Sequence, residues 1–192
     1  MRVVGIDPGL VRTGWAVVEP SPPTTAPPGG ITVLSYGLIV PPAAEDLPRR
    51  LAEGARGLRR VLETYEPSAA ALEEIFTAPR HPRSALLMAH MRGVICLVLD
   101  EAGIPILPLT ATTVKQRLTG SGHASKSQIQ RMVLRLTGVV ARPGMRWDES
   151  DALALAIAGL SQAARPTRGQ AVRPPTGRRI SPMLQAVLAR RR

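Results

Sequence analysis

The spacing of hydrophobic residues predicts five β-strands in this chain. Apolar stretches rich in branched residues at 2–6 and 15–18 indicate two strands joined by a turn, and a third strand follows at 31–40. Because only turns separate these three, we expect them to form an antiparallel meander. Two further apolar runs, at 68–76 and 104–109, predict the fourth and fifth strands.

Helical periodicity separates the later strands. Apolar residues that recur every three or four positions predict an amphipathic helix over 47–65. A long, mostly apolar helix is expected over 84–103, with Ser84 as its N-cap and Gly103 at its end. Three more helices are expected after the fifth strand, over residues 112–120, 125–138 and 148–160.

The order of these elements describes an α/β protein with a mixed sheet. The first three strands are antiparallel, and the later strands need helical crossovers. The proline-rich segment 20–30 cannot continue a ladder, because proline has no N–H donor, so we expect a long exposed turn there.

Positive charge is concentrated at the C-terminal end of the sequence. The net charge is +11, but residues 161–192 hold eight of the 25 basic residues and no acid, which leaves +3 for the first 160 residues. The surplus is compatible with a polyanionic partner, whereas a basic tail alone is also typical of a solvated end. We expect one domain over 1–160, followed by a basic, flexible tail over 161–192.

Several classes of protein are disfavoured by composition. Aromatic residues make up only 3% of the chain, which argues against broad stacking platforms for single-stranded nucleic acid. The single cysteine, Cys96, cannot form an internal disulfide and is expected to act as a small buried hydrophobe. No apolar stretch is long enough for a membrane helix or a signal segment, so a cytoplasmic protein is expected.

Four carboxylates stand where buried elements begin or end. Asp7 ends the first strand, Glu73 ends the fourth, and Asp148 and Asp151 begin the last helix, one turn apart on one face. If strand ends and a helix start converge at one sheet edge, these acids repel each other unless a cation neutralises them. Oxygen ligands of this kind suit Mg²⁺ or Mn²⁺. Singly, each acid also has a structural role available, as a turn former, an exposed strand end or a partner of the helix dipole.

A set of motifs in a fixed order resembles one known family. The motifs are "GIDPGLVRTGWAVVE", "LEEIF", "TVKQ", "SKSQIQRMV" and "DESDALALA". Residues 1 to about 160 closely resemble the RuvC family of crossover (Holliday) junction endodeoxyribonucleases. The "DPG…TG" turn alone is shared by the wider ribonuclease H-like superfamily, but the joined set is specific.

The resemblance implies a ribonuclease H-like fold, a five-stranded mixed sheet flanked by helices. It implies a homodimer that binds a four-way DNA junction and cuts two strands symmetrically in recombination and repair, with the RuvA–RuvB branch-migration machinery as partner. The family's metal-binding, catalytic carboxylates correspond to Asp7, Glu73, Asp148 and Asp151. Two Mg²⁺ ions are expected, with Mn²⁺ as a substitute, and Asp7 is the best candidate to bridge them because a strand end holds it rigidly.

Further residues are expected to contact DNA. The resemblance places Lys115 and Lys126 near the scissile phosphate and assigns Phe76 to an aromatic that stacks on a base at the junction centre. Arg80 and Arg83 follow in a basic loop and could contact phosphates. The lysines could instead be solvated helix surface, and Phe76 a core residue.

Alternatives remain at this point. The apolar helix over 84–102 is either a dimer surface or packed on the sheet. Besides a Mg²⁺-dependent junction nuclease, the function could be that of a catalytically silent junction-binding module, a small actin-like ATPase or a related RNA-processing nuclease. The intact set of acids argues against the silent module. An actin-like ATPase needs two such domains, for which 192 residues are too few.

Overall fold

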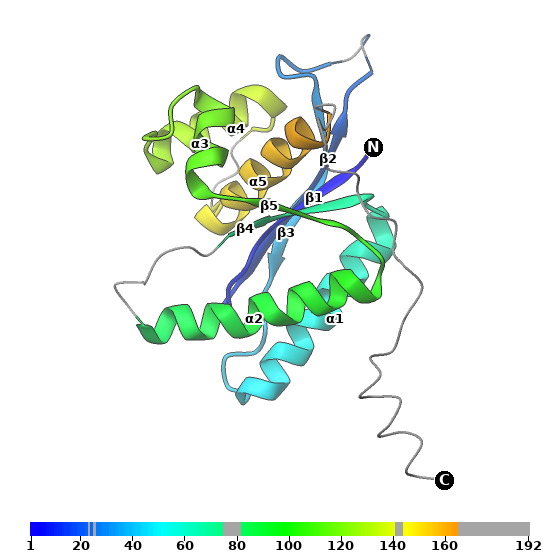
Figure 1. Ribbon diagram of the computed structural model, residues 1–192, viewed down its shortest axis with the longest axis vertical. Helices are drawn as coiled ribbons and strands as arrows, with labels where there is room; N and C mark the ends of the chain where they lie inside the picture. Colours follow the sequence, from blue (N-terminus) through cyan, green and yellow to red (C-terminus); the bar gives the residue numbers. More distant parts are fainter. Residues whose placement is uncertain (23, 25, 75–81, 141–143, 165–192) are drawn as a thin grey trace, which may run out of the picture.

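The computed structural model has the strands and helices in the predicted order (Figure 1). It describes residues 1–22, 24, 26–74, 82–140 and 144–164. The strands are β1 Val3–Asp7, β2 Thr13–Pro20, β3 Ile31–Ile39, β4 Ala69–Glu73 and β5 Ile106–Leu109. The helices are α1 Leu47–Tyr65, α2 Pro82–Glu101, α3 Ala111–Thr119, α4 Lys126–Thr137 and α5 Trp147–Ala163.

The strands form one mixed sheet in the order β3-β2-β1-β4-β5. β1 pairs antiparallel with β2, and β2 pairs antiparallel with β3, which confirms the predicted meander. β4 and β5 join as parallel strands, each reached through a helix, as a crossover connection requires. Strand β1 therefore lies in the middle of the sheet, and its C-terminal end points to the same edge as that of β4.

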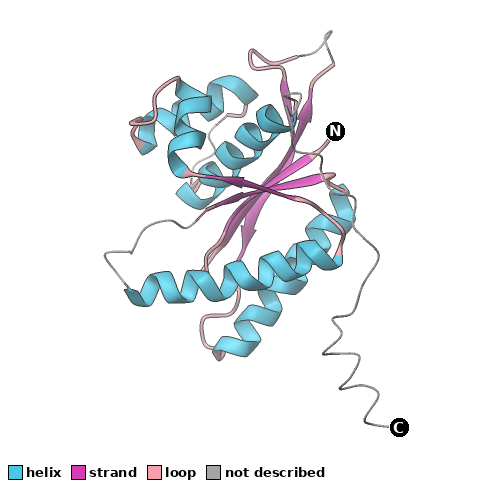
Figure 2. Cartoon of the chain, viewed as in Figure 1, coloured by secondary structure: helices cyan, strands magenta, loops and turns pink. Residues whose placement is uncertain are grey.

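Helices cover both faces of the sheet (Figure 2). One core cluster joins α5 to the sheet together with α3 and α4, and the other joins α1 and α2 to the opposite face. Side chains of β1 alternate between the two, because Val3 packs with α5 whereas Val4 and Ile6 pack with α1 and α2. Cys96 of α2 is partly buried against the second cluster, consistent with its predicted packing role.

Helix α5 lies unusually close to the central strands. A Cβ atom on Gly5 of β1 would stand 2.2 Å from the carbonyl oxygen of Ala152 and 2.3 Å from the amide nitrogen of Ala156. On the helix side, Gly159 makes the matching approach to Ala71 of β4, where a Cβ would lie 2.6 Å from the alanine Cβ. The alanine-rich sequence of α5 thus serves backbone-to-backbone packing, which any larger side chain would prevent.

Some element boundaries differ from the sequence-based expectation. Ser84 is not the N-cap of α2, because the helix begins two residues earlier at Pro82, a residue suited to the first helical position. β4 ends at Glu73, and β5 begins only at Ile106. α5 continues beyond the predicted 160 to Ala163.

The proline-rich turn between β2 and β3 is attached to the helical layer. Its described residues are mostly exposed, as expected, but the amide of Gly29 donates a hydrogen bond of 3.0 Å to the carbonyl of Leu136 in α4. Residues 165–192, most of the expected basic tail, lie outside the described part of the chain. Within the described part, none of the helices combines the length and the apolar character needed to cross a membrane.

Replacing Gly5 by alanine tests the close docking of α5. The new methyl group would overlap the helix backbone, so we expect Gly5→Ala to lower the free energy of unfolding by about 2–4 kcal/mol, measured by urea denaturation. Gly37→Ala in β3 is the matched control, since its Cβ would meet the Trp15 ring at an ordinary 3.4 Å. Equal stability of the two variants would contradict the proposed packing.

Candidate active site

Two parallel strands and one helix deliver four carboxylates to one edge of the sheet. Asp7 ends β1, and Glu73 ends the neighbouring parallel strand β4. Asp148 and Asp151 lie in the first turns of α5. Their approach depends on Gly14, which pairs with Asp7 in the sheet, because a Cβ there would stand 2.1 Å from the carbonyl oxygen of Asp148.

The pKa shifts of these acids reflect electrostatic interactions between them. Burial, and then the charges of Asp151, Asp148 and Glu73 in that order, together raise the pKa of Asp7 from 3.8 to about 7, against the opposing charge of Lys126. Burial, then the charge of Asp151, raises the pKa of Glu73, and burial also raises the pKa of Asp151. Residues far apart in the chain therefore share one electrostatic environment.

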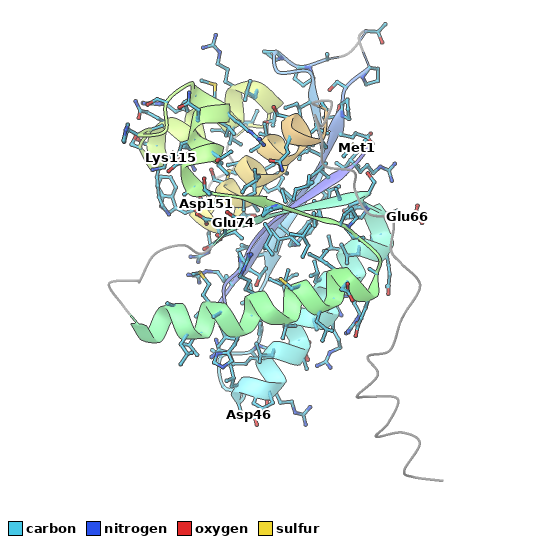
Figure 3. All side chains as sticks on the ribbon, in the orientation of Figure 1. Met1, Asp46, Glu66, Glu74, Lys115 and Asp151 are labelled. Atoms are coloured by element: carbon cyan, nitrogen blue, oxygen red, sulfur yellow. The ribbon has the colours of Figure 1, made fainter. Side chains whose placement is uncertain are left out.

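Both predicted lysines lie beside these acids. Nζ of Lys126 is 3.3 Å from Oδ2 of Asp151, with which it forms an ion pair. Figure 3 shows Lys115 and Asp151 on the side of the molecule where α3 and α5 approach the end of β4. A pocket of about 200 Å³ there is lined by Glu73, Lys115, Lys126 and Asp151, with an apolar wall from α3, α4 and α5. Four of the predicted residues thus share one pocket, and Asp7 and Asp148 are coupled to it through their charges.

Two arginines at this edge were not predicted from the sequence as site residues. Nε of Arg12, in the turn between β1 and β2, is 3.4 Å from Oδ2 of Asp148. Arg92 of α2 donates a hydrogen bond to the backbone carbonyl of Glu73, and its charge helps to lower the pKa of that glutamate. A signal was present for each: Arg12 lies in the turn that follows Asp7, and Arg92 is a cation in the middle of a mostly apolar helix.

Three predicted DNA contacts are not placed by the structure. Phe76 and Arg80 lie outside the described residues. Arg83 belongs to α2, but its side chain lies outside the described part as well. These assignments stay predictions.

The carboxylates fit a hard divalent cation by their chemistry. Among the described residues, no group of three or more acidic, histidine or cysteine side chains lies close enough together to form a complete metal-binding site. The donors at the edge are nevertheless all carboxylate oxygens, the ligands that Mg²⁺ and Mn²⁺ prefer. Four carboxylates meet at this edge, whereas only Lys126 and Arg12 pair with them, through Asp151 and Asp148, so the residues present suit a further cation.

Removing the charge of Asp7 should stabilise the metal-free protein in a pH-dependent way. The folded-state pKa of about 7 exceeds the ordinary 3.8, so the cost of ionising Asp7 is absent below about pH 4, grows between pH 4 and 7 and is complete above pH 7. We expect Asp7→Asn to raise the free energy of unfolding by on the order of 2–4 kcal/mol at pH 8, and by little near pH 4.

Urea denaturation in the presence of a chelator measures this difference. Asp100→Asn, on the exposed surface of α2, is the matched control and should change stability little at either pH. A gain from Asp7→Asn that is the same at pH 4 and pH 8 would contradict the electrostatic explanation.

Comparison with known proteins identifies the family of this chain. The family model "Crossover junction endodeoxyribonuclease RuvC" matches residues 3–159. A protein of that name from Syntrophomonas wolfei is 39% identical over 160 residues, which cover 83% of this chain and 88% of the relative. Its namesake from Chloroflexus aggregans is 40% identical over 160 residues, covering 82% and 91%.

Solved structures show the same relationship. Thermus thermophilus RuvC in complex with a Holliday junction substrate superposes with a TM-score of 0.74 at 28% identity, covering 87% of this chain and 99% of that protein. A further structure of Thermus thermophilus RuvC gives a TM-score of 0.72 at 29% identity, covering 85% and 95%. On its sequence and its fold, this chain belongs to the RuvC family of crossover junction endodeoxyribonucleases.

Proposed function

We propose that this protein is a metal-dependent endonuclease that resolves four-way DNA junctions by hydrolysing one phosphodiester bond in each of two strands. Family membership supports the reaction class. The observation that carries the assignment of the site is the burial of Asp7 at the end of the central strand, among three other carboxylates and next to Lys126. A carboxylate that only stabilises a turn gains nothing from three acidic neighbours, whereas such like-charge clusters are typical of functional sites.

The carboxylates and lysines divide the chemistry between them. We assign Asp7, Glu73, Asp148 and Asp151 as the residues that would hold two Mg²⁺ ions, with Mn²⁺ as a substitute. Such ions supply activation of water and Lewis-acid stabilisation of the phosphate when bound.

Lys115 and Lys126 line the same pocket as Glu73 and Asp151, and we assign them to holding the scissile phosphate and offsetting the negative charge that develops on it. Arg12 restrains the carboxylate of Asp148 from the β1–β2 turn.

The DNA and protein partners follow from the same assignment. Phe76 is proposed to stack on a base at the junction centre, with Arg80 and Arg83 on neighbouring phosphates. The RuvA–RuvB branch-migration complex is the proposed protein partner, and the DNA substrate favours a cytoplasmic location. We also propose that residues 1–160 form the nuclease domain and that the arginine-rich segment 161–192 is a flexible tail.

A homodimer is supported by the two faces of α2. Met91 and Ile95 on the inner face are buried in the core, so this face of the helix packs on the sheet, one of the two roles expected from the sequence. On the outer face, Leu86 and Leu97 are 60% and 56% exposed. Gly93 lies between them at helical spacing and has open space around it, which permits close approach of a second helix. We assign this outer face to the contact between two copies of the chain.

Loss of single carboxylates should separate cutting from binding. We expect Asp7→Asn and Glu73→Gln each to lower the rate of junction cleavage in Mg²⁺ by at least about a hundredfold, while junction affinity in a gel-shift assay is retained. Glu74→Gln is the matched control, since Glu74 is adjacent in sequence, lies beyond β4 and does not line the pocket. Undiminished cutting by Asp7→Asn would reject the assigned role.

The same assay distinguishes the other functions. Wild-type protein is compared on a four-way junction, a plain duplex and structured RNA. Junction binding without any cutting would favour the silent binding module. Preferential cleavage of RNA would favour the RNA-processing nuclease.

Charge on the outer face of α2 should dissociate the dimer. We expect Leu97→Glu to shift the molecular mass measured by light scattering from that of two chains to that of one, because a buried unpaired carboxylate opposes association. Val40→Glu is the matched control, because Val40 is similarly exposed, at 61%, and follows β3 rather than lying on α2. A dimer that survives Leu97→Glu would place the interface elsewhere.

A further inference from the structure

A second hollow lies beside the active-site pocket, on the other side of α4. It encloses about 650 Å³ between the end of α3, the connection that follows it and the middle of α4. Figure 1 shows these two helices together as a lobe on the side of the sheet opposite to α1 and α2. The hollow is lined by Thr119, Ser121, His123, Ala124, Gln128, Arg131, Met132 and Arg135.

Helix α4 presents different residues to the two pockets. Lys126 and Ile129 line the active-site pocket, whereas Arg131 and Arg135 line the second hollow. At 3.6 residues per turn, the step from Lys126 to Arg131 turns the side chain by about 140°, so the two cannot serve one bound group. Arg131 and Arg135 are one turn apart and share a face, with Cβ atoms about 5–6 Å from each other.

The two arginines are not engaged within the described part of the chain. Arg131 and Arg135 are exposed, and neither side chain makes a hydrogen bond or an ion pair with another described residue. In contrast, Arg2, Arg56 and Arg59 each hold a glutamate in an ion pair. The described lining of the hollow contains no carboxylate, so its positive charge is uncompensated.

The remaining lining groups suit a sugar-phosphate chain. The side-chain oxygen of Gln128 accepts a hydrogen bond of 2.8 Å from the amide of Ser125, which leaves its NH₂ group to donate. Ser121 adds a hydroxyl and His123 a ring N–H at the rim. Met132 and the buried Ala124 form an apolar floor against which a deoxyribose can pack.

We propose that this hollow, with Arg131 and Arg135 as its charged groups, is a second binding site for the phosphate backbone of DNA, separate from the site that holds the scissile phosphate. The occupant is a DNA segment other than the one being cut, held by phosphate contacts that position it without reading its sequence. The proposal rests on the proposed function, since a four-way junction supplies a second DNA segment next to the cut strand.

Salt-dependent binding of the full chain tests the proposal. Each phosphate contact contributes about 0.9 to the slope of log affinity against log salt concentration. We expect Arg131→Ala/Arg135→Ala to reduce this slope by about 1.8 and to weaken binding of a fluorescently labelled junction, measured by anisotropy. Arg131→Lys/Arg135→Lys should keep most of the slope, because lysine retains the charge.

A matched pair removes the same charge elsewhere. Arg49→Ala/Arg60→Ala on α1 also removes two exposed cations, but from the opposite face of the sheet, and should leave both the slope and the cleavage rate unchanged. Thermal melting verifies that all variants fold. A slope for Arg131→Ala/Arg135→Ala equal to that of the α1 pair overturns the proposal.

The test separates this site from the proposed activity. Junction cleavage by the wild type together with an unchanged slope in the α4 variant rejects the second site and keeps the nuclease. A reduced slope on plain duplex DNA, with no junction cleavage by the wild type, keeps the site and rejects the nuclease. Absence of DNA binding by the wild type rejects both.

Discussion

The gathering of partly buried carboxylates at one edge of the sheet is the constraint on which this structure depends. Asp7 is partly buried at the end of the central strand, and this burial, followed by the charges of Asp151, Asp148 and Glu73, raises its pKa to about 7. Such a group lowers the stability of the metal-free fold whenever it is ionised. The packing of the sheet and its two helical layers must therefore hold these acids close together in spite of their repulsion. Such a cost in stability is typical of catalytic and binding sites.

The means of holding them is close backbone packing. Gly5 and Gly14 allow α5 to approach the two central strands at distances that no Cβ would permit, and Gly14 lies directly opposite Asp7 in the sheet. The contact that stabilises the core is thus also the one that delivers Asp148 to the edge. Since α5 is rich in alanine, it contributes little side-chain bulk between its backbone and the sheet.

Helices α2 and α4 each serve two purposes through different faces. The inner face of α2 completes the core, while exposed leucines remain on its outer face. In α4, Lys126 pairs with Asp151 at the active-site pocket, whereas Arg131 and Arg135 line a separate basic hollow. Because side chains three or four positions apart share a helix face, a short segment can carry both sets without mixing them. The geometry of the helix thereby concentrates positive charge at the pocket and at the hollow, even though the described part of the chain has only a modest excess of basic over acidic residues.

The sequence by itself determined the order of strands and helices, the antiparallel start and the candidate acids. Alternating and helical hydrophobic patterns are local, and Asp7 and Glu73 could be recognised because each ends such a pattern. The resemblance to a known family added Lys115 and Lys126. Only the tertiary structure revealed Arg12 beside Asp148 and the glycine contacts of α5, because these depend on how closely segments far apart in the chain approach each other.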